Sequence, residues 1–215
     1  MTKVYPNIAA ASTPVVEKLK SSSLDTADAI VLTVWKKSLL FNCNGFTVYD
    51  GSGNLVFRVD NYMAGSGANG EIVLMDADGK PLLTIRRKRL SLGDNWLVYD
   101  GETAVNPLFS VRKHVKILNT KSLAHVSGNS SSGSTSNSKN IVYEIEGSYS
   151  QRSCAVYDDK HRRVAEIKQK EAVGGVAFGV DVFRLIIGPK MDTSVAMAIV
   201  ILLDQMFGSS RRFHT

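Results

Sequence analysis

The sequence predicts a mainly β protein: a closed barrel of roughly twelve antiparallel strands, built of hairpins around one buried C-terminal helix. Two observations favour this fold class. The first is a unit that recurs along the chain, an Asp-led turn between two short apolar stretches. The second is the unbroken apolar run VAMAIVILL at residues 195–203. A helix that is apolar on every side must be buried on every side, and a sheet closed around it loses its exposed edges.

The recurring unit consists of an apolar pair, an Asp-led turn and a second strand that ends in a basic residue. Its four copies begin at Gly45, Glu71, Asn95 and Cys154. Val-Tyr-Asp itself recurs at 48–50, 98–100 and 156–158. Asp and Gly favour tight turns because they accept positive φ and bond nearby backbone groups. We therefore interpret an Asp or Tyr repeated at the same turn position as structural and not catalytic.

Shorter patterns predict the other strands. Residues 29–41 are expected to form a strand pair interrupted near Lys36-Lys37, and residues 180–187 the last strand. Residues 115–121 and 141–147 are expected to pair around the loop at 127–140, which is rich in Ser, Gly and Asn. We predict that this loop is mobile.

The apolar run is predicted to be a helix from Asp192 to Phe207, about 23 Å long at about 1.5 Å per residue. Asp192, Thr193 or Ser194 can cap its N-terminus, and Gly208 can end it. A membrane span needs roughly 20 apolar residues, so a run of nine is too short. We therefore expect a helix buried inside the barrel.

The domain organisation follows from composition. With 44% hydrophobic residues the chain can build a core without disulfides, and Cys43 and Cys154 lack a CxxC partner. We expect a loosely ordered arm at 1–23, a single barrel domain at 24–208 and a short tail at 209–215. The N-terminal residues lack the apolar core of a signal peptide, which favours an intracellular, reduced protein.

Motifs for catalysis or metal binding are incomplete. Residues 65–70 match GxGxxG, but a strand follows where a dinucleotide site needs a helix. Residues 76–79 resemble the start of a calcium loop that lacks its distal Glu. The four histidines lack metal-ligand spacing, and Glu144 and Glu146, on one strand face, are the kind of pair that is usually solvated. We therefore expect a non-enzymatic protein without cofactor, catalytic residues or metal ligands.

Basic residues are concentrated in two parts of a chain whose net charge is +6. Residues 86–116 hold seven Lys and Arg against three Asp and Glu, and residues 160–215 hold nine against five. Such blocks favour an anionic partner, lipid headgroups or nucleic acid, with a solvated face as an equal alternative.

The densest basic cluster comes at the end of a predicted strand. Four consecutive cations place charge on both strand faces, and their crowding favours a bound anion. An edge strand protected by charge against aggregation explains the cluster equally well. With two cations of the following hairpin, the predicted anion- or phospholipid-binding residues are Arg86, Arg87, Lys88, Arg89, Arg112 and Lys113.

Several of these segments resemble the LURP-one-related family of plants. They are GFTVYDGSGNLVFRV, LMDADGKPLLTIRRK, LSLGDNWLVYD, YEIEGSYSQRSCAVYD and DTSVAMAIVILLDQM. Together they cover nearly all of residues 29–207. The resemblance implies a tubby-like fold, which is a twelve-stranded barrel threaded by a C-terminal helix. Phospholipid scramblases are expected to share this fold. The resemblance also implies an association with plant defence.

The same resemblance implies a ligand. LLTIRRKRLSLGDNWLVYD is similar to the stretch through which tubby proteins, membrane-tethered transcription regulators, bind phosphatidylinositol bisphosphate. Leu90 and Leu92 depart from that pattern, where further cations are expected. We expect a cytoplasmic protein that binds anionic phospholipid at the membrane periphery, with the nucleus as a further location. The alternative is a protein-interaction or nucleic-acid-linked regulatory module without lipid function, nucleic acid being the less favoured partner.

Overall fold

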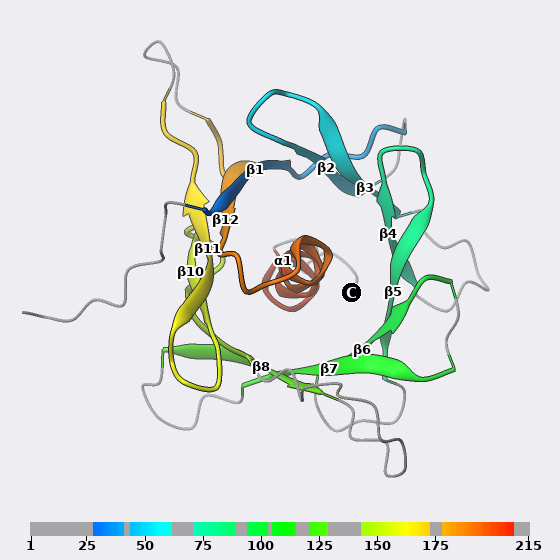
Figure 1. Cartoon of the computed structure of the whole chain (residues 1–215), viewed down its shortest axis with the longest axis vertical. Coiled ribbons are helices and arrows are strands. Elements are labelled where there is room, and N and C mark those ends of the chain that lie inside the picture. The colour runs from blue at the N-terminus through cyan, green and yellow to red at the C-terminus, as the bar shows by residue number, and fades with distance from the viewer. Residues whose placement is uncertain are drawn as a thin grey trace, which may run out of the picture.

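The computed structural model describes residues 28–40, 44–61, 71–88, 94–102, 105–114, 121–128, 143–172 and 178–208. Within these ranges, twelve antiparallel strands close into a barrel around one helix (Figure 1), which confirms the predicted fold class. The elements are β1 (Ile30–Trp35), β2 (Asn44–Tyr49), β3 (Leu55–Asn61), β4 (Ile72–Asp76), β5 (Pro81–Arg87), β6 (Asn95–Asp100), β7 (Pro107–Lys113), β8 (Ser122–Gly128), β9 (Tyr143–Ser148), β10 (Ser153–Tyr157), β11 (Arg163–Gln169), β12 (Val182–Ile187) and α1 (Thr193–Phe207).

Each strand pairs with its neighbours in sequence, and β1 closes the barrel by pairing with both β2 and β12. Strand direction therefore alternates around the barrel, which gives it two different ends. We call the end where the even-numbered strands finish and α1 begins the turn end, because the Asp-led turns lie there. We call the end where the odd-numbered strands and α1 finish the basic end.

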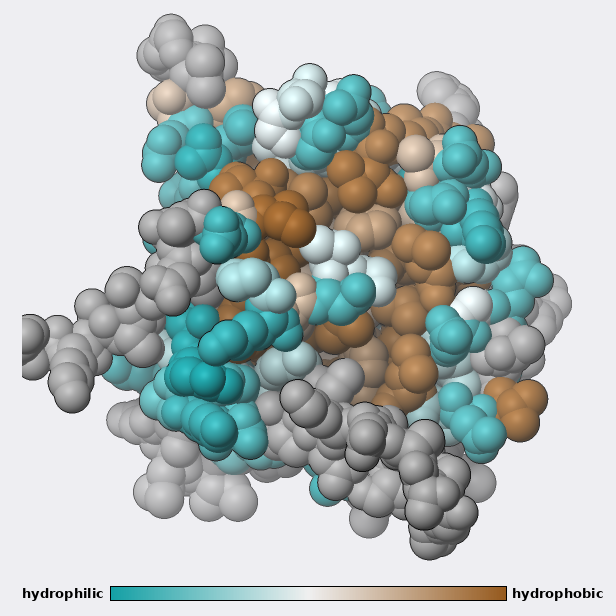
Figure 2. All heavy atoms as spheres, in the orientation of Figure 1, coloured by the Kyte–Doolittle hydropathy of each residue, from teal (hydrophilic) through white to brown (hydrophobic). Residues whose placement is uncertain are grey.

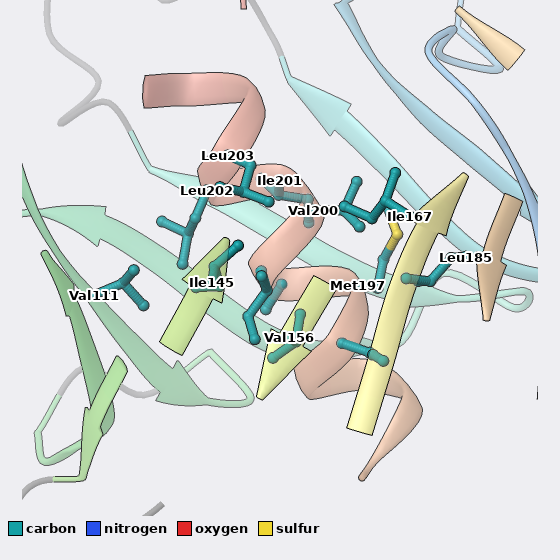
Figure 3. Packing of buried hydrophobic residues seen from close by; sticks show 14 of the residues in the cluster. Val111, Ile145, Val156, Ile167, Leu185, Met197, Val200, Ile201, Leu202 and Leu203 are labelled. Carbon is teal, nitrogen blue, oxygen red and sulfur yellow. The ribbon is translucent and has the colours of Figure 1, made fainter. Parts of the chain in front are cut away.

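The core is the space between the strands and α1. Inward side chains of the strands, including Val111, Ile145 and Leu185, point at helix residues such as Met197 and Val200 (Figure 3). All of these are at most 1% exposed. Burial of apolar surface on every side of α1 explains why its sequence carries no polar face.

Both ends of α1 are fixed as the sequence suggests. The Asp192 carboxylate accepts hydrogen bonds from the N–H groups of Ser194 and Val195, at 2.8 and 3.1 Å, so Asp192 is the N-cap. The N–H of Gly208 donates to the Asp204 carbonyl at 2.7 Å. A Cβ on Gly208 would lie 2.4 Å from that oxygen, so glycine is needed for close approach and not for a left-handed turn.

The repeated turn aspartates are structural, as predicted. Asp50 Oδ1 accepts the N–H groups of Ser52 and Asn54, both at 2.8 Å. Asp158 Oδ1 accepts those of Lys160 and Arg162, at 3.0 and 2.8 Å. Each carboxylate therefore closes its own turn.

One predicted strand is wrong, and another lies mostly outside the described residues. Of the predicted strand pair at 29–41, the described residues 29–40 form only β1, which ends at Trp35. Beyond it the Ser38 hydroxyl donates to the buried Asp60 carboxylate at 2.5 Å, and Arg58 donates to the same carboxylate. This polar contact replaces a second strand. β9 pairs with β10 and with β8, at Ser122–Gly128, whereas most of the predicted partner at 115–121 lies outside the described residues.

The predicted loop and termini fall mostly outside the described residues. Ser127 and Gly128, assigned to the loop at 127–140, instead end β8. The rest of that loop, the arm at 1–23 and the tail at 209–215 are not described. The domain boundaries therefore stay a prediction.

Candidate anion-binding site

Charged residues are divided between the two ends of the barrel. The turn end carries Asp50, Asp76, Asp78, Asp100, Glu102, Asp158, Asp159 and Asp192 against Lys80, Lys160, Arg162 and Lys190. The basic end carries Lys36, Lys37, Arg86, Arg87, Lys88, Arg112, Lys113, Lys121, Arg152, Lys168 and Lys170 against Asp60, Glu71, Asp94, Glu171, Asp181 and Asp204. Among the described residues, one end is thus predominantly acidic and the other predominantly basic.

This division follows from the repeat in the sequence. Each copy places an Asp in its turn, and the second, third and fourth copies place a basic residue where their second strand finishes. In a barrel whose strands alternate in direction, those two positions lie at opposite ends. The helix dipole has the matching sense, because α1 has its positive N-terminus at the acidic end and its negative C-terminus at the basic end. Figure 2 shows the turn end, with hydrophilic residues around its rim and apolar ones nearer the middle.

Arg86, the first predicted site residue, is half-buried on the outer wall of the barrel. Its Nη2 lies 2.9 Å from Glu71 Oε1, and its guanidinium lies 5.8 Å from the centre of the Tyr99 ring. The Glu71 carboxylate compensates this positive charge. Arg86 therefore contributes less to binding an external anion than its place in the sequence suggests.

Arg87 and Lys113 share one carboxylate. Asp94 Oδ1 lies 2.7 Å from Arg87 Nη2, and Asp94 Oδ2 lies 3.9 Å from Lys113 Nζ. Lys113 Nζ also donates to the Met206 carbonyl at 3.1 Å and lies 4.6 Å from the centre of the Phe207 ring. Lys113 thus stabilises the C-terminus of α1, where a free carbonyl and the helix dipole favour a cation.

Lys88 and Arg112 are the exposed cations of the predicted site that form no ion pair within the described ranges. The Lys88 N–H donates to the Asn95 carbonyl at 2.8 Å, and Asn95 is opposite Arg112 in the β6–β7 register. The two cations therefore flank the start of β6. Arg89 lies outside the described residues.

The structure brings further cations to the same end that the sequence did not assign to a site. Lys37 is exposed and forms no ion pair in the described part of the chain. Lys36 Nζ is bound to Asp204 Oδ1 at 2.9 Å. Arg152 is buried, with its guanidinium 4.1 and 4.3 Å from the centres of the Tyr149 and Phe183 rings. The Lys36-Lys37 pair was visible in the sequence, but only as a strand interruption.

The LURP-one-related family model matches residues 30–204, most of the chain. The chain belongs to the LURP-one-related family. It is similar to protein LURP-one-related 8 of Arabidopsis thaliana, with 56% identity over 98% of this chain and 100% of that protein. It is 46% identical to protein LURP-one-related 17 of the same plant, over 82% of each chain.

A solved structure supports the fold of this LURP-one-related protein. An X-ray structure of a protein from Arabidopsis thaliana matches with a TM-score of 0.56 over 82% of this chain and 91% of that chain. The two sequences are 22% identical, so the likeness concerns the fold alone. No helix in the described part of the chain combines the length and apolar character needed to cross a membrane.

Other reactive groups of the LURP-one-related protein lie away from the basic cluster. Glu144 and Glu146 share one strand face, as predicted, and their ligand atoms lie within 4.8 Å of those of His161. The His161 ring stacks on Tyr157, with ring centres 4.4 Å apart. The sequence did not connect His161 to this pair, because a turn residue and a strand meet only in the fold.

The described cysteine is not a reactive thiol. Burial raises the pKa of Cys154 to about 12, against a weaker opposing effect of the Arg152 charge. The thiol therefore stays protonated at neutral pH, and a protonated thiol is a poor nucleophile.

Proposed function

We propose that this LURP-one-related protein is a non-enzymatic module that attaches to anionic phospholipid surfaces, phosphoinositide headgroups included, through the basic end of its barrel. The observation that carries the proposal is the division of charge between the two ends. Lys88 and Arg112 would supply uncompensated charge, and Arg86, Arg87 and Lys113 would add to the positive potential around them.

The size of the barrel makes the charge division effective. Strands of six or seven residues span about 20 Å at about 3.3 Å per residue. The screening length at physiological salt is only about 8 Å. A negative surface at the basic end therefore interacts with the cations there and hardly with the acids of the turn end. Each cation near such a surface contributes about 1 kcal/mol, which favours weak, reversible and oriented attachment.

The finer parts of the proposal are supported by the resemblance of the sequence segments. They are a relation to tubby proteins and phospholipid scramblases, and a role in plant defence. The proposal places the protein in the cytoplasm at the membrane periphery. It adds the nucleus as a second location, where a membrane-tethered regulator would act after its release from the membrane.

Charge reversal at the two ends tests the proposal. Lys88→Glu with Arg112→Glu should abolish co-sedimentation with phosphoinositide liposomes at low salt. Lys80→Glu with Lys190→Glu is the matched control, because it changes the net charge equally at exposed positions of the turn end. The control should bind like the wild type. Reversing Arg86 or Arg87 is a poorer test, because the new carboxylate would face Glu71 or Asp94 and destabilise the fold.

Wild-type protein that ignores these liposomes at low salt would contradict the proposal. A DNA mobility shift at the same salt then separates the alternatives. A shift would favour a nucleic-acid-linked regulator, and no shift a protein-interaction module. Equal loss of liposome binding in both double variants would show that net charge matters and the end of the barrel does not.

A further inference from the structure

We infer that the basic end carries an apolar edge, made of Trp35, Leu39 and Val180, that enters the interfacial layer of an anionic bilayer. This inference rests on the proposed function and adds to it a second contact on another wall of the barrel. The three side chains are 42%, 49% and 51% exposed.

The three residues come from two segments that lie side by side at the basic end. Trp35 ends β1 and is opposite Val182 of β12 in the register of the sheet. The Lys36 N–H donates to the Asp181 carbonyl at 2.7 Å, which joins the residues after β1 to those before β12. The Trp35 ring also packs edge-on against Tyr49, with ring centres 5.9 Å apart; Tyr49 is opposite Thr33, so this contact lies on the outer wall above the rim.

Buried polar contacts hold both segments in place. Next to Leu39, the Ser38 hydroxyl donates to the Asp60 carboxylate, which is almost fully buried. The Val180 carbonyl accepts a hydrogen bond from Nε of the buried Arg152 at 2.7 Å. The backbone is thus fixed while Leu39 and Val180 project into solvent. Large apolar side chains kept exposed on a fixed support are typical of a contact surface.

The charges around this edge favour a bilayer as the partner. Lys36 and Lys37 lie between Trp35 and Leu39 in the chain; the charge of Lys36 is compensated by Asp204, whereas Lys37 forms no ion pair in the described part of the chain. Lys170 Nζ lies 5.3 Å from the centre of the Phe178 ring. Aromatic and aliphatic side chains interleaved with lysines are the composition of interfacial anchors.

Acidic residues weaken this preference without reversing it. Asp181 is exposed on the same edge, while the Glu171 carboxylate lies 3.7 Å from Arg184 Nη1. The apolar residues Val31 and Leu108 are similarly exposed, at 41% and 45%, but they lie toward the turn end, where acids predominate and repel an anionic surface.

The apolar edge and the Lys88–Arg112 pair lie on different walls of one end. In the closed order of strands, β1 and β12 are separated from β6 and β7 by several strands in either direction, and Figure 1 shows the two pairs across α1 from each other. A flat surface laid across this end therefore meets cations on one side and the apolar edge on the other.

The two tryptophans make the inference measurable. Trp35 is exposed, whereas Trp96 is only 3% exposed. With vesicles of phosphatidylcholine and phosphatidylserine, wild-type emission should shift to the blue, and lipids brominated on the acyl chain should quench it. Trp35→Phe should abolish the shift and the quenching, because the remaining Trp96 is already buried.

A pair of double variants tests the apolar contribution. Leu39→Ser with Val180→Ser should weaken vesicle binding about tenfold, because partial burial of two aliphatic side chains is lost. Val31→Ser with Leu108→Ser is the control and should bind like the wild type. Both variants change exposed positions, so their melting temperatures should stay close to that of the wild type.

The outcomes distinguish this inference from the proposed function. The first outcome is that wild-type protein binds vesicles without quenching of Trp35 and that both double variants bind equally well. This outcome overturns the inference of an inserted apolar edge and leaves the charge-based attachment intact. No binding of the wild type at low salt overturns both. In a third outcome, the wild type forms a dimer that the Leu39→Ser, Val180→Ser variant converts to a monomer. That result would assign the edge to a second copy of the chain and overturn the bilayer inference.

Discussion

The two ends of the barrel use their charged residues differently. At the turn end, the contacts are local: Asp50, Asp158 and Asp192 bond groups two to four residues further along the chain. At the basic end, the contacts that hold α1 join distant parts of the sequence, although the Arg87–Asp94 pair there spans only seven residues. Lys113 and Met206 are 93 residues apart, and Tyr149 and Asp204 are 55 apart.

This difference predicts different roles in stability. A local turn contact can form within its own hairpin before the barrel closes. A contact between α1 and a distant strand exists only once the barrel has closed around the helix. We therefore expect changes at the turn end to have small, separate effects, and changes at the basic end to affect how α1 is held.

The largest expected effect comes from the helix that joins the two ends. Ile199 is 1% exposed in the middle of α1, and Ile199→Asp places an unpaired charge in the core. Such a charge costs several kcal/mol, against a typical total stability of about 5–15 kcal/mol. Soluble, cooperatively melting protein should be lost, as judged by circular dichroism and calorimetry. Ile199→Val, the control, should cost only about 1 kcal/mol. A variant that melts near the wild-type temperature would contradict burial of the helix.

The next effect compares the two ends of α1 directly. Asp204 Oδ1 lies 2.9 Å from Lys36 Nζ and accepts the Tyr149 hydroxyl at 3.2 Å. Asp204→Ala leaves both partners without their acceptor and should lower the free energy of unfolding by about 2–3 kcal/mol. Asp192→Ala at the turn end removes only the helix cap and should cost about 1 kcal/mol. Urea unfolding measures both. Equal costs would show that long-range contacts at the basic end matter no more than a local cap.

The same comparison explains what could be predicted from the sequence. The alternating strands, the Asp-led turns and the apolar helix with its Asp192 cap depend on neighbouring residues, and the structure confirms them. Residues 122–128 are not predicted as a strand because the register shifts between Ser122 and Ala124, so that three consecutive residues are buried and the alternation of strand faces is lost.

Pairing at the basic end could not be predicted for a physical reason. The run Arg86 to Arg89 resembles a uniform basic cluster in sequence, yet Arg86 contacts Glu71, 15 residues away. Lys113 donates a hydrogen bond to the Met206 carbonyl at the end of α1, and the two residues come close only when the barrel closes. The residue types of the candidate site can be read from the sequence, whereas the fold decides which cations have a charge partner; within the described ranges Lys88 and Arg112 have none.

The smallest expected effect is a pH dependence confined to one turn. Burial alone would raise the pKa of Asp158, but hydrogen bonds from the Arg162 side chain and from the Arg162 and Lys160 N–H groups outweigh it and lower the pKa below its usual value. A lowered pKa stabilises the folded state above the unfolded-state value of about 3.9, and this contribution is lost as the pH falls through the folded-state pKa. Asp158→Asn should therefore cost under about 1 kcal/mol at pH 6, since the pair with Arg162 is solvent-accessible, and almost nothing near pH 2.

Asp159→Asn is the matched control, because Asp159 forms no hydrogen bond or ion pair within the described residues, and its unfolding profile should follow the wild type. Urea unfolding between pH 2 and pH 6 measures these differences. If Asp158→Asn instead costs more than about 2 kcal/mol, the turn is coupled to the rest of the barrel, and the contrast between local and long-range ends fails.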